Sequence, residues 1–211
     1  MRANKLLHFF VSGSSSSLSY NSHKAEYYEL NNNIIGLLKL YQTLNVSDSF
    51  NDCVNVEIPF VPSGIRLGAS SSDVVAQLGK AKYSISKNIG KGHSVLFYRQ
   101  NIKGINILTQ VHLFDNIVVY VKVSFDYLEA SKGARSSIYH SLKSKYELDI
   151  DVNKDNYYID VNNNYLKVID NGQINVQFFY NNNEIINDIK SNLTDTVSGK
   201  GNSEDLIKDL I

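Results

Sequence analysis

The sequence predicts a layered α+β fold, in which an antiparallel β-meander sheet carries helices on one face. Two segments alternate apolar and polar residues as hairpins do, and a helical pattern precedes each of them. The 211 residues, 43% hydrophobic and 20% charged, are enough for a full core. Helices segregated from such a sheet are typical of α+β proteins. We therefore expect an N-terminal strand and helix region (1–61), two tandem helix-plus-meander units (62–128 and 129–182) and a C-terminal helical tail (183–211).

Two short segments predict the helices that precede the meanders. In GIRLGASSSDVVAQLGK (64–80), Ser70 can cap a helix together with Asp73, as in a capping box, and Gly79 can end it. This helix is too short to be stable alone, so it must pack on the strands that follow. Apolar residues spaced by four predict the second helix over about 134–148, namely Ile138, Leu142 and Tyr146.

The segment GINILTQVHLFDNIVVYVKVSFDY predicts the first hairpin, and burial selects its register. A two-residue turn at 115–116 would mix polar and apolar side chains on one face. A three-residue loop at 114–116 places Val111 opposite Val119 and makes one face almost wholly apolar. A shift of one residue exchanges the faces, so we expect the three-residue loop, with Asn116 in the left-handed conformation.

The segment YLKVIDNGQINVQFFY predicts the second hairpin by the same reasoning. A three-residue loop at 170–172 pairs Val168 with Ile174, gives one apolar face and places Gly172 in the left-handed position. The remaining segments predict a buried strand at 6–11, a helix at 23–44 that is weakened by its Asn run, an edge strand at 53–61 that contains Pro59, and helices at 182–193 and 203–211.

The segment GIRLGASSSDVVAQLGKAKY and the later VHLFDNIVVYVKVSF resemble a bacterial repeat motif. They resemble the repeat of the small lipoprotein of the outer-membrane β-barrel assembly machinery, and are similar to the tandem repeats of β-lactamase inhibitory proteins. Lys80 and Ala81 stand where proline is common in that family, and no lipobox cysteine is present. The resemblance implies a helix-plus-meander unit whose open sheet face binds other proteins. It covers about a third of the chain and rests on Gly64, Leu67, Gly68, Ser71 or Ser72, Val74, Leu78, Gly79, Asp115, Val119, Val121 and Val123.

Several chemistries find little support in the sequence. The 21 basic and 21 acidic residues leave no net charge, unlike a nucleic-acid binder. The histidines lack ligand spacing, and Ser14–Ser17 lack the lysine of a phosphate-binding loop. Asp149, Asp151 and Asp155 are similar to a calcium loop without its glycine and distal glutamate. We therefore expect no catalytic residues, cofactor, metal site or nucleic-acid partner.

The location follows from the N-terminus and the cysteine content. The apolar run at 6–11 is short and is interrupted by His8, so it differs from a signal peptide, and we expect no membrane span. Cys53 is the single cysteine, which excludes an intrachain disulfide. A cytoplasmic location is expected, with a periplasmic or secreted one as the alternative.

The sheet face opposite the predicted core is the predicted binding surface. Its tyrosine, lysine and amide side chains can bury area while they offer hydrogen bonds, as protein interfaces do. The same face could instead be solvated or be covered by the N-terminal helix. The predicted partner-binding residues are Leu108, Gln110, His112, Tyr120, Lys122, Tyr165, Lys167 and Gln177.

The function expected from this surface is that of a non-enzymatic protein-binding module, such as an inhibitor or immunity-like factor. Its partner would be another protein, whose identity the sequence leaves open together with the oligomeric state. One alternative is a small-molecule-binding protein or enzyme that uses the Ser-rich N-terminal loop with sheet residues. A second alternative is an envelope-associated structural protein.

Overall fold

The computed structural model of the protein describes residues 33–45, 53–126, 132–151 and 156–198. The chain forms two compact units, Met1–Ile35 and Gly36–Ile211, and the architecture given below is that of the second. The predicted strand at 6–11, Ser14–Ser17 and the predicted helix at 203–211 lie outside the described residues.

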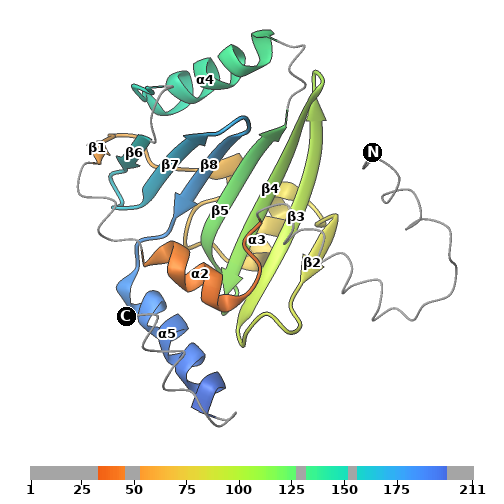
Figure 1. The fold of residues 1–211 in the computed structure, drawn as a ribbon, viewed down its shortest axis with the longest axis vertical. Coiled ribbons are helices and arrows are strands. Elements are labelled where there is room, and N and C mark those ends of the chain that lie inside the picture. Colours follow the sequence, from red (N-terminus) through yellow and green to blue (C-terminus); the bar gives the residue numbers. More distant parts are fainter. Residues whose placement is uncertain (1–32, 46–52, 127–131, 152–155, 199–211) are drawn as a thin grey trace, which may run out of the picture. The chain divides into compact units, whose positions relative to one another are not determined.

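One eight-stranded sheet organises this unit, with the strand order β1-β6-β7-β8-β5-β4-β3-β2 (Figure 1). Only the β1–β6 pair is parallel, and every other pair of neighbours is antiparallel. The two meanders join through their last strands, β5 and β8. The layered α+β fold is thus confirmed. The strands are β1 (Val54–Asn55), β2 (Tyr83–Ile85), β3 (His93–Ile102), β4 (Ile105–Phe114), β5 (Ile117–Asp126), β6 (Asn156–Ile159), β7 (Tyr165–Asp170) and β8 (Ile174–Phe179).

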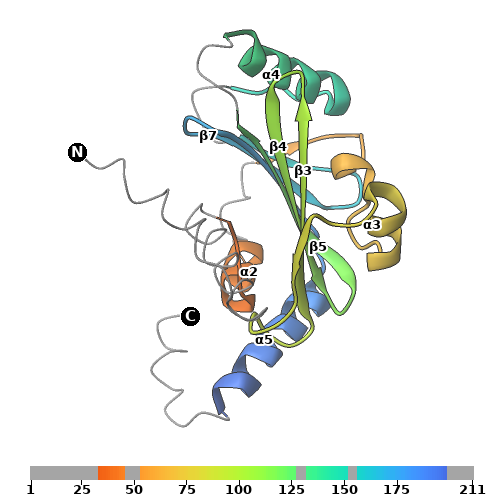
Figure 2. The same ribbon diagram turned by 90° about the vertical axis from the view of Figure 1, so that its right-hand side faces the viewer.

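Helices lie on both sides of the sheet. A helix precedes each meander, and α3 and α4 share one face and one apolar core, whereas α2 lies on the opposite face (Figure 2). In the described part of the chain, no helix has the length and apolarity that a bilayer crossing requires. The helical elements are α2 (Leu37–Leu44), the 3-10 turn η3 (Pro62–Gly64), α3 (Ser71–Leu78), α4 (Lys132–Tyr146) and α5 (Asn183–Ser198).

The helix α3 begins and ends where the sequence predicts. The Ser70 hydroxyl accepts a hydrogen bond from the Asp73 N–H at 3.2 Å, and the Asp73 carboxylate accepts one from the Ser70 N–H at 3.0 Å. The capping box is therefore confirmed. Gly79 ends the helix with φ 74°, a conformation that suits glycine. Val74, which is fully buried, packs the helix against the core.

The first hairpin differs from its predicted register. Its loop is the two-residue turn Asp115–Asn116, with φ 46° and 67°, so the predicted three-residue loop is wrong. A β-bulge lies between His112 and Leu113 and leaves Val119 as the extra residue of β5. Beyond the bulge Val111 pairs with Val121 rather than with Val119.

The second hairpin has a three-residue loop as predicted, but the loop lies one residue later, at 171–173. Gly172 has φ 93°, which confirms its left-handed conformation. Val168 therefore pairs with Val176 and not with Ile174. Because the loop begins and ends one residue later than predicted, each β7 residue pairs with the β8 residue two positions further along the chain. The predicted apolar face is unchanged.

Three other elements differ in extent from their predictions. The helix predicted at 23–44 is not continuous, because residues 33–36 are not helical and Gly36, with φ 95°, precedes α2. The strand predicted at 53–61 has only two residues, although β1 does lie at the sheet edge. The helix predicted at 182–193 is longer and reaches Ser198.

A buried carboxylate holds the chain segment before η3 on the sheet. Asp160 accepts hydrogen bonds from the backbone N–H of Phe60 at 2.7 Å and of Asn164 at 2.8 Å. Phe60 thereby lies in the core, where its ring meets Tyr146 and Phe178 edge to face, with centroids 5.6 and 6.2 Å away.

Candidate functional site

The register of β4, β5, β7 and β8 brings all eight predicted partner-binding residues onto one sheet face, which we name the row face. The residues on this face form rows that cross the strands, because directly paired residues share a face. Tyr165, Phe179, Tyr120 and His112 form an aromatic row; Lys167, Gln177, Lys122 and Gln110 form an amide–lysine row; and Asn175, Ser124 and Leu108 form a third row.

The centre of the row face is buried. Gln110, His112, Tyr120 and Lys122 are 1, 0, 0 and 8% exposed, so the expectation of an open face is wrong for these four. They lie on the neighbouring strands β4 and β5, inside a sheet that has helices on both sides (Figure 2). The outer predicted residues, on β4, β7 and β8, are half-buried: Leu108, Tyr165, Lys167 and Gln177.

Ring contacts link three members of the aromatic row, His112, Tyr120 and Phe179. The His112 ring meets Tyr120 edge to face with centroids 5.2 Å apart, and Tyr120 meets Phe179 at 5.3 Å. His93 of β3 extends the series, with its ring 5.1 Å from His112. Burial raises the pKa of the Tyr120 phenol, so this side chain is neutral at pH 7.

His93 is the member of this cluster that the sequence analysis did not single out. Its Nε2 lies 2.9 Å from Nδ1 of His112, and only 2% of the residue is exposed. Burial lowers the pKa of His93 to about 4 and that of His112 well below its ordinary value, with the His93 charge as a smaller cause. Both imidazoles are therefore neutral at pH 7. A predicted pairing of β3 with β4, added to the hairpin of β4 and β5, would have indicated that His93 lies beside His112.

Polar atoms in the row face differ in how well they are satisfied. The Ser124 hydroxyl donates to Oδ1 of Asn175 at 2.7 Å, a cross-strand bond between β5 and β8. Within the described residues, Nε2 of His112 and the Tyr120 hydroxyl have no hydrogen-bond partner, although both are fully buried. Burial also lowers the pKa of Lys122. Buried polar groups of this kind are costly, so the centre of the row face is the more tightly constrained part.

The other face of the sheet contains an apolar cleft of about 520 Å³ beneath α4, which we name the α4 cleft. Its apolar lining combines side chains of β4, β5 and β8 with Ile138 and Leu142 of α4. Lys103, Ser137, Ser141 and Lys145 also line it, and none of its lining residues in the described ranges is acidic. The apolar strand residues that line it include Ile107, Val123, Phe125 and Phe178.

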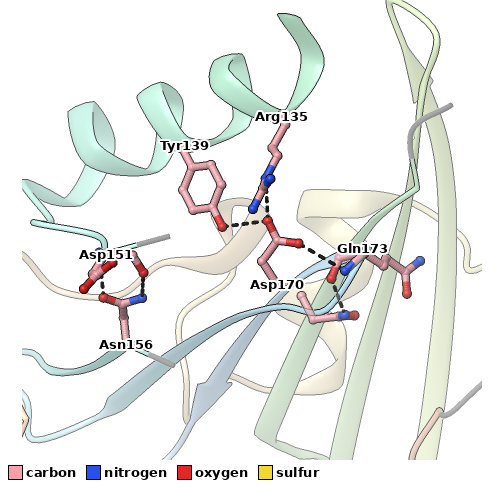
Figure 3. Close-up of polar contacts among 8 residues, drawn as sticks. Arg135, Tyr139, Asp151, Asn156, Asp170 and Gln173 are labelled. Atoms are coloured by element: carbon pink, nitrogen blue, oxygen red, sulfur yellow. Dashed lines mark hydrogen bonds and ion pairs between the residues drawn. The ribbon is translucent and has the colours of Figure 1, made fainter. Parts of the chain in front are cut away.

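Hydrogen bonds fix α4 over this cleft at both ends. Near its start, the Asp170 carboxylate accepts from Nε of Arg135 at 2.7 Å and from the Tyr139 hydroxyl at 2.9 Å (Figure 3). Near its end, Lys145 and Tyr146 donate to the Val61 carbonyl at 3.0 and 3.1 Å. The roof of the cleft is thus held in place by the sheet and by the segment before η3.

The described residues contain no group of three or more His, Cys, Asp or Glu side chains that could hold a metal ion. Of the segment that is similar to a calcium loop, Asp149 and Asp151 are described, and Asp155 lies outside the described residues.

Comparisons with known proteins give no relative: no family model matches the chain, and neither a curated protein nor a solved structure matches it. We therefore infer the function from the two sheet faces.

Proposed function

We propose that this protein is a protein-binding module that contacts its partner through the outer part of the row face. The observation that carries the proposal is the grouping of Tyr165, Lys167 and Gln177 on the neighbouring strands β7 and β8. These half-buried side chains lie at the outer end of the aromatic row and in the amide–lysine row beside it. Aromatic and polar side chains that can bury area and still offer hydrogen bonds are typical of interaction surfaces.

An aromatic ring and an ordered lysine lie beside Tyr165 on the sheet. Tyr165 pairs across the strands with Phe179, which packs on Tyr120. The Lys167 ammonium lies 4.8 Å from the centroid of the Tyr157 ring, a cation–π contact that restricts the lysine. Side chains that are already ordered lose less conformational entropy when a partner binds.

The order of elements supports the same proposal. Each meander follows a helix, and α3 and α4 lie on one face, away from the proposed surface. This arrangement is the one that the resemblance to β-lactamase inhibitory proteins implies for a tandem repeat. We further propose that the protein acts as an inhibitor or immunity-like factor and that its two helix-plus-meander units form a tandem repeat.

Site-specific photo-crosslinking tests the surface directly. A photoreactive phenylalanine analogue at Tyr165 or Gln177 should give a discrete crosslinked product in cells of the source organism. The matched control is the same analogue at Val75, which is 50% exposed on α3, on the other side of the sheet. Products of equal yield at all three positions, or none at 165 and 177, would contradict the proposal.

The identified partner then permits an affinity measurement. Tyr165→Ala should weaken binding by roughly 10-fold or more, because buried tyrosine anchors contribute above about 1 kcal/mol to such interfaces. Val75→Ala should leave the affinity unchanged. Circular dichroism of both variants should show that the sheet is intact.

A further inference from the structure

We propose that the α4 cleft is a second binding site, which takes an amphipathic carboxylate of the medium-chain fatty-acid class. The apolar chain would lie between α4 and the sheet, and the carboxylate would lie at the lysine-bearing mouth. This site is on the sheet face opposite the row face, so it goes beyond the proposed protein-binding function and does not depend on it.

The cleft has the size and lining that an apolar chain requires. Its volume of about 520 Å³ lies within the range of about 300–1,000 Å³ that is usual for small-molecule sites. The floor contains Val123 and Phe178, and the roof contains Ile138 and Leu142, which are all largely buried core residues. An alkyl chain in this space would remove apolar surface from water, which is the main favourable term for such ligands.

The charge of the lining selects an anionic head group. Lys103 and Lys145 both line the cleft, and among the described residues no aspartate or glutamate lines it. Among the described residues, neither lysine forms an ion pair. The Lys145 ammonium donates one hydrogen bond, to the Val61 carbonyl, and an ammonium has three donors. A carboxylate beside either lysine would supply a counter-charge.

The site is preformed. Asp170 holds the first part of α4 through Arg135 and Tyr139, and the Val61 carbonyl holds the last turn through Lys145 and Tyr146. A roof fixed at both ends keeps the cleft open without a ligand, so little ordering cost accompanies binding.

Fluorescence titration with 11-(dansylamino)undecanoate tests the proposal on the full chain. The chain contains no tryptophan, so protein emission does not overlap the measurement strongly. We expect a saturable blue-shifted increase with one site per chain. Dodecanoate should displace the probe at lower concentration than dodecanol, which has the same chain without the charge. Equal displacement by both, or an increase that does not saturate, would overturn the proposal.

Variants locate the site. Ser141 and Ser136 are both exposed on α4, but only Ser141 lines the cleft. Ser141→Trp should fill the mouth and abolish probe binding, whereas Ser136→Trp should leave it unchanged. The double variant Lys103→Gln/Lys145→Gln should weaken dodecanoate binding by roughly 3- to 10-fold and leave dodecanol unaffected.

Unchanged probe binding in Ser141→Trp would place the probe elsewhere and reject the site. The lysine variant provides a separate check, because both side chains are exposed. Lys145 also donates to the Val61 carbonyl, so unchanged dodecanol binding by this variant shows that the roof of the cleft is intact. Loss of probe binding with intact crosslinking at Tyr165 would separate the cleft from the protein-binding surface. The two proposals can therefore fail independently.

Discussion

His93 and His112 share a buried hydrogen bond between β3 and β4, with Nε2 of His93 2.9 Å from Nδ1 of His112. Nδ1 of His93 lies 3.2 Å from the Ile89 carbonyl, which can only accept, so Nδ1 of His93 carries the proton. In a neutral imidazole the other nitrogen then accepts, and Nδ1 of His112 must donate. This hydrogen-bond network assigns the tautomers and leaves Nε2 of His112 as a bare, buried acceptor.

The same carbonyl links the histidine pair to α2. The Ile89 carbonyl also accepts from the Leu37 N–H at 2.7 Å, at the first residue of α2. Gly90, with φ 115°, lies so close to Leu37 that a β-carbon there would be 2.5 Å from the Leu37 side chain. A charge on the histidine pair would therefore disturb the contact that holds the start of α2.

Acid should destabilise the protein through these two histidines. Their pKa values are lower in the folded state than the unfolded value of 6.5, so the unfolded chain binds more protons below that pH. The stability that neutral His93 contributes is complete above pH 6.5 and is lost as the pH falls towards about 4, and that of His112 is lost in the same direction. At pH 5 we expect a loss of about 2 kcal/mol from His93 and a further loss from His112, measured by urea unfolding at pH 7.5 and pH 5.

His112→Phe is the matched control for this pH dependence, because phenylalanine keeps the ring contact with Tyr120 and cannot titrate. The variant should lose roughly half of the stability change between pH 7.5 and pH 5. A pH profile identical to that of the unaltered chain would show that other groups cause the acid sensitivity.

Asp170 should be the most sensitive position for the docking of α4. Asp170→Ala removes the acceptor for Arg135 and Tyr139 and leaves a partly buried phenol without its partner. We expect a loss of about 2 kcal/mol in the free energy of unfolding, as for hydrogen bonds to charged groups. Arg135→Gln, on an exposed residue, should cost under about 1 kcal/mol. Urea unfolding that gives equal losses for both variants would contradict this account.

The cap of α3 gives a sharper local test. Ser70→Ala removes the hydroxyl that accepts from the Asp73 N–H, and caps of this type contribute about 1 kcal/mol. Ser71→Ala, one residue later, should stay within about 0.5 kcal/mol of the unaltered chain. Because α3 is tied to β5 by the Ser70–Ile117 bridge, the loss should appear in the global unfolding transition rather than in local fraying.

The capping box was predictable because its signals are local. Ser70, Asp73 and Gly79 lie within ten residues, and each acts through its own backbone neighbourhood. The apolar faces of both hairpins were predictable for a similar reason, since alternation fixes which residues share a face. Val111, Val121 and Val123 are therefore core residues as expected.

The hairpin registers could not be obtained from alternation alone. Val111 lies on the same face as Val121 in both arrangements, the two-residue turn with a bulge and the three-residue loop without one. In the first arrangement the extra residue Val119 compensates for the shorter loop, so the alternation of faces is the same. Burial of apolar side chains therefore does not distinguish the two arrangements. Only the backbone conformation of the turn separates them.

The alternation pattern also could not predict that the row face is buried. Gln110, His112 and Lys122 alternate with apolar residues, as solvent-facing side chains do. The missed signal was IVVYVKV, at 117–123, whose apolar residues occupy both faces. Such a run is typical of a strand buried on both sides, and Tyr120 is indeed fully buried.

The left-handed conformation of Asn116 in the Asp115–Asn116 turn can be tested by mutation. Asn116 has φ 67°, a conformation that glycine adopts freely and that costs alanine about 1 kcal/mol or more. We therefore expect Asn116→Gly to be at least as stable as the unaltered chain, and Asn116→Ala to be less stable by about 1 kcal/mol. Asn106, exposed in the extended strand β4, should show the opposite order, with alanine above glycine. Thermal and urea unfolding of these four variants that gives one order at both positions would exclude the two-residue turn.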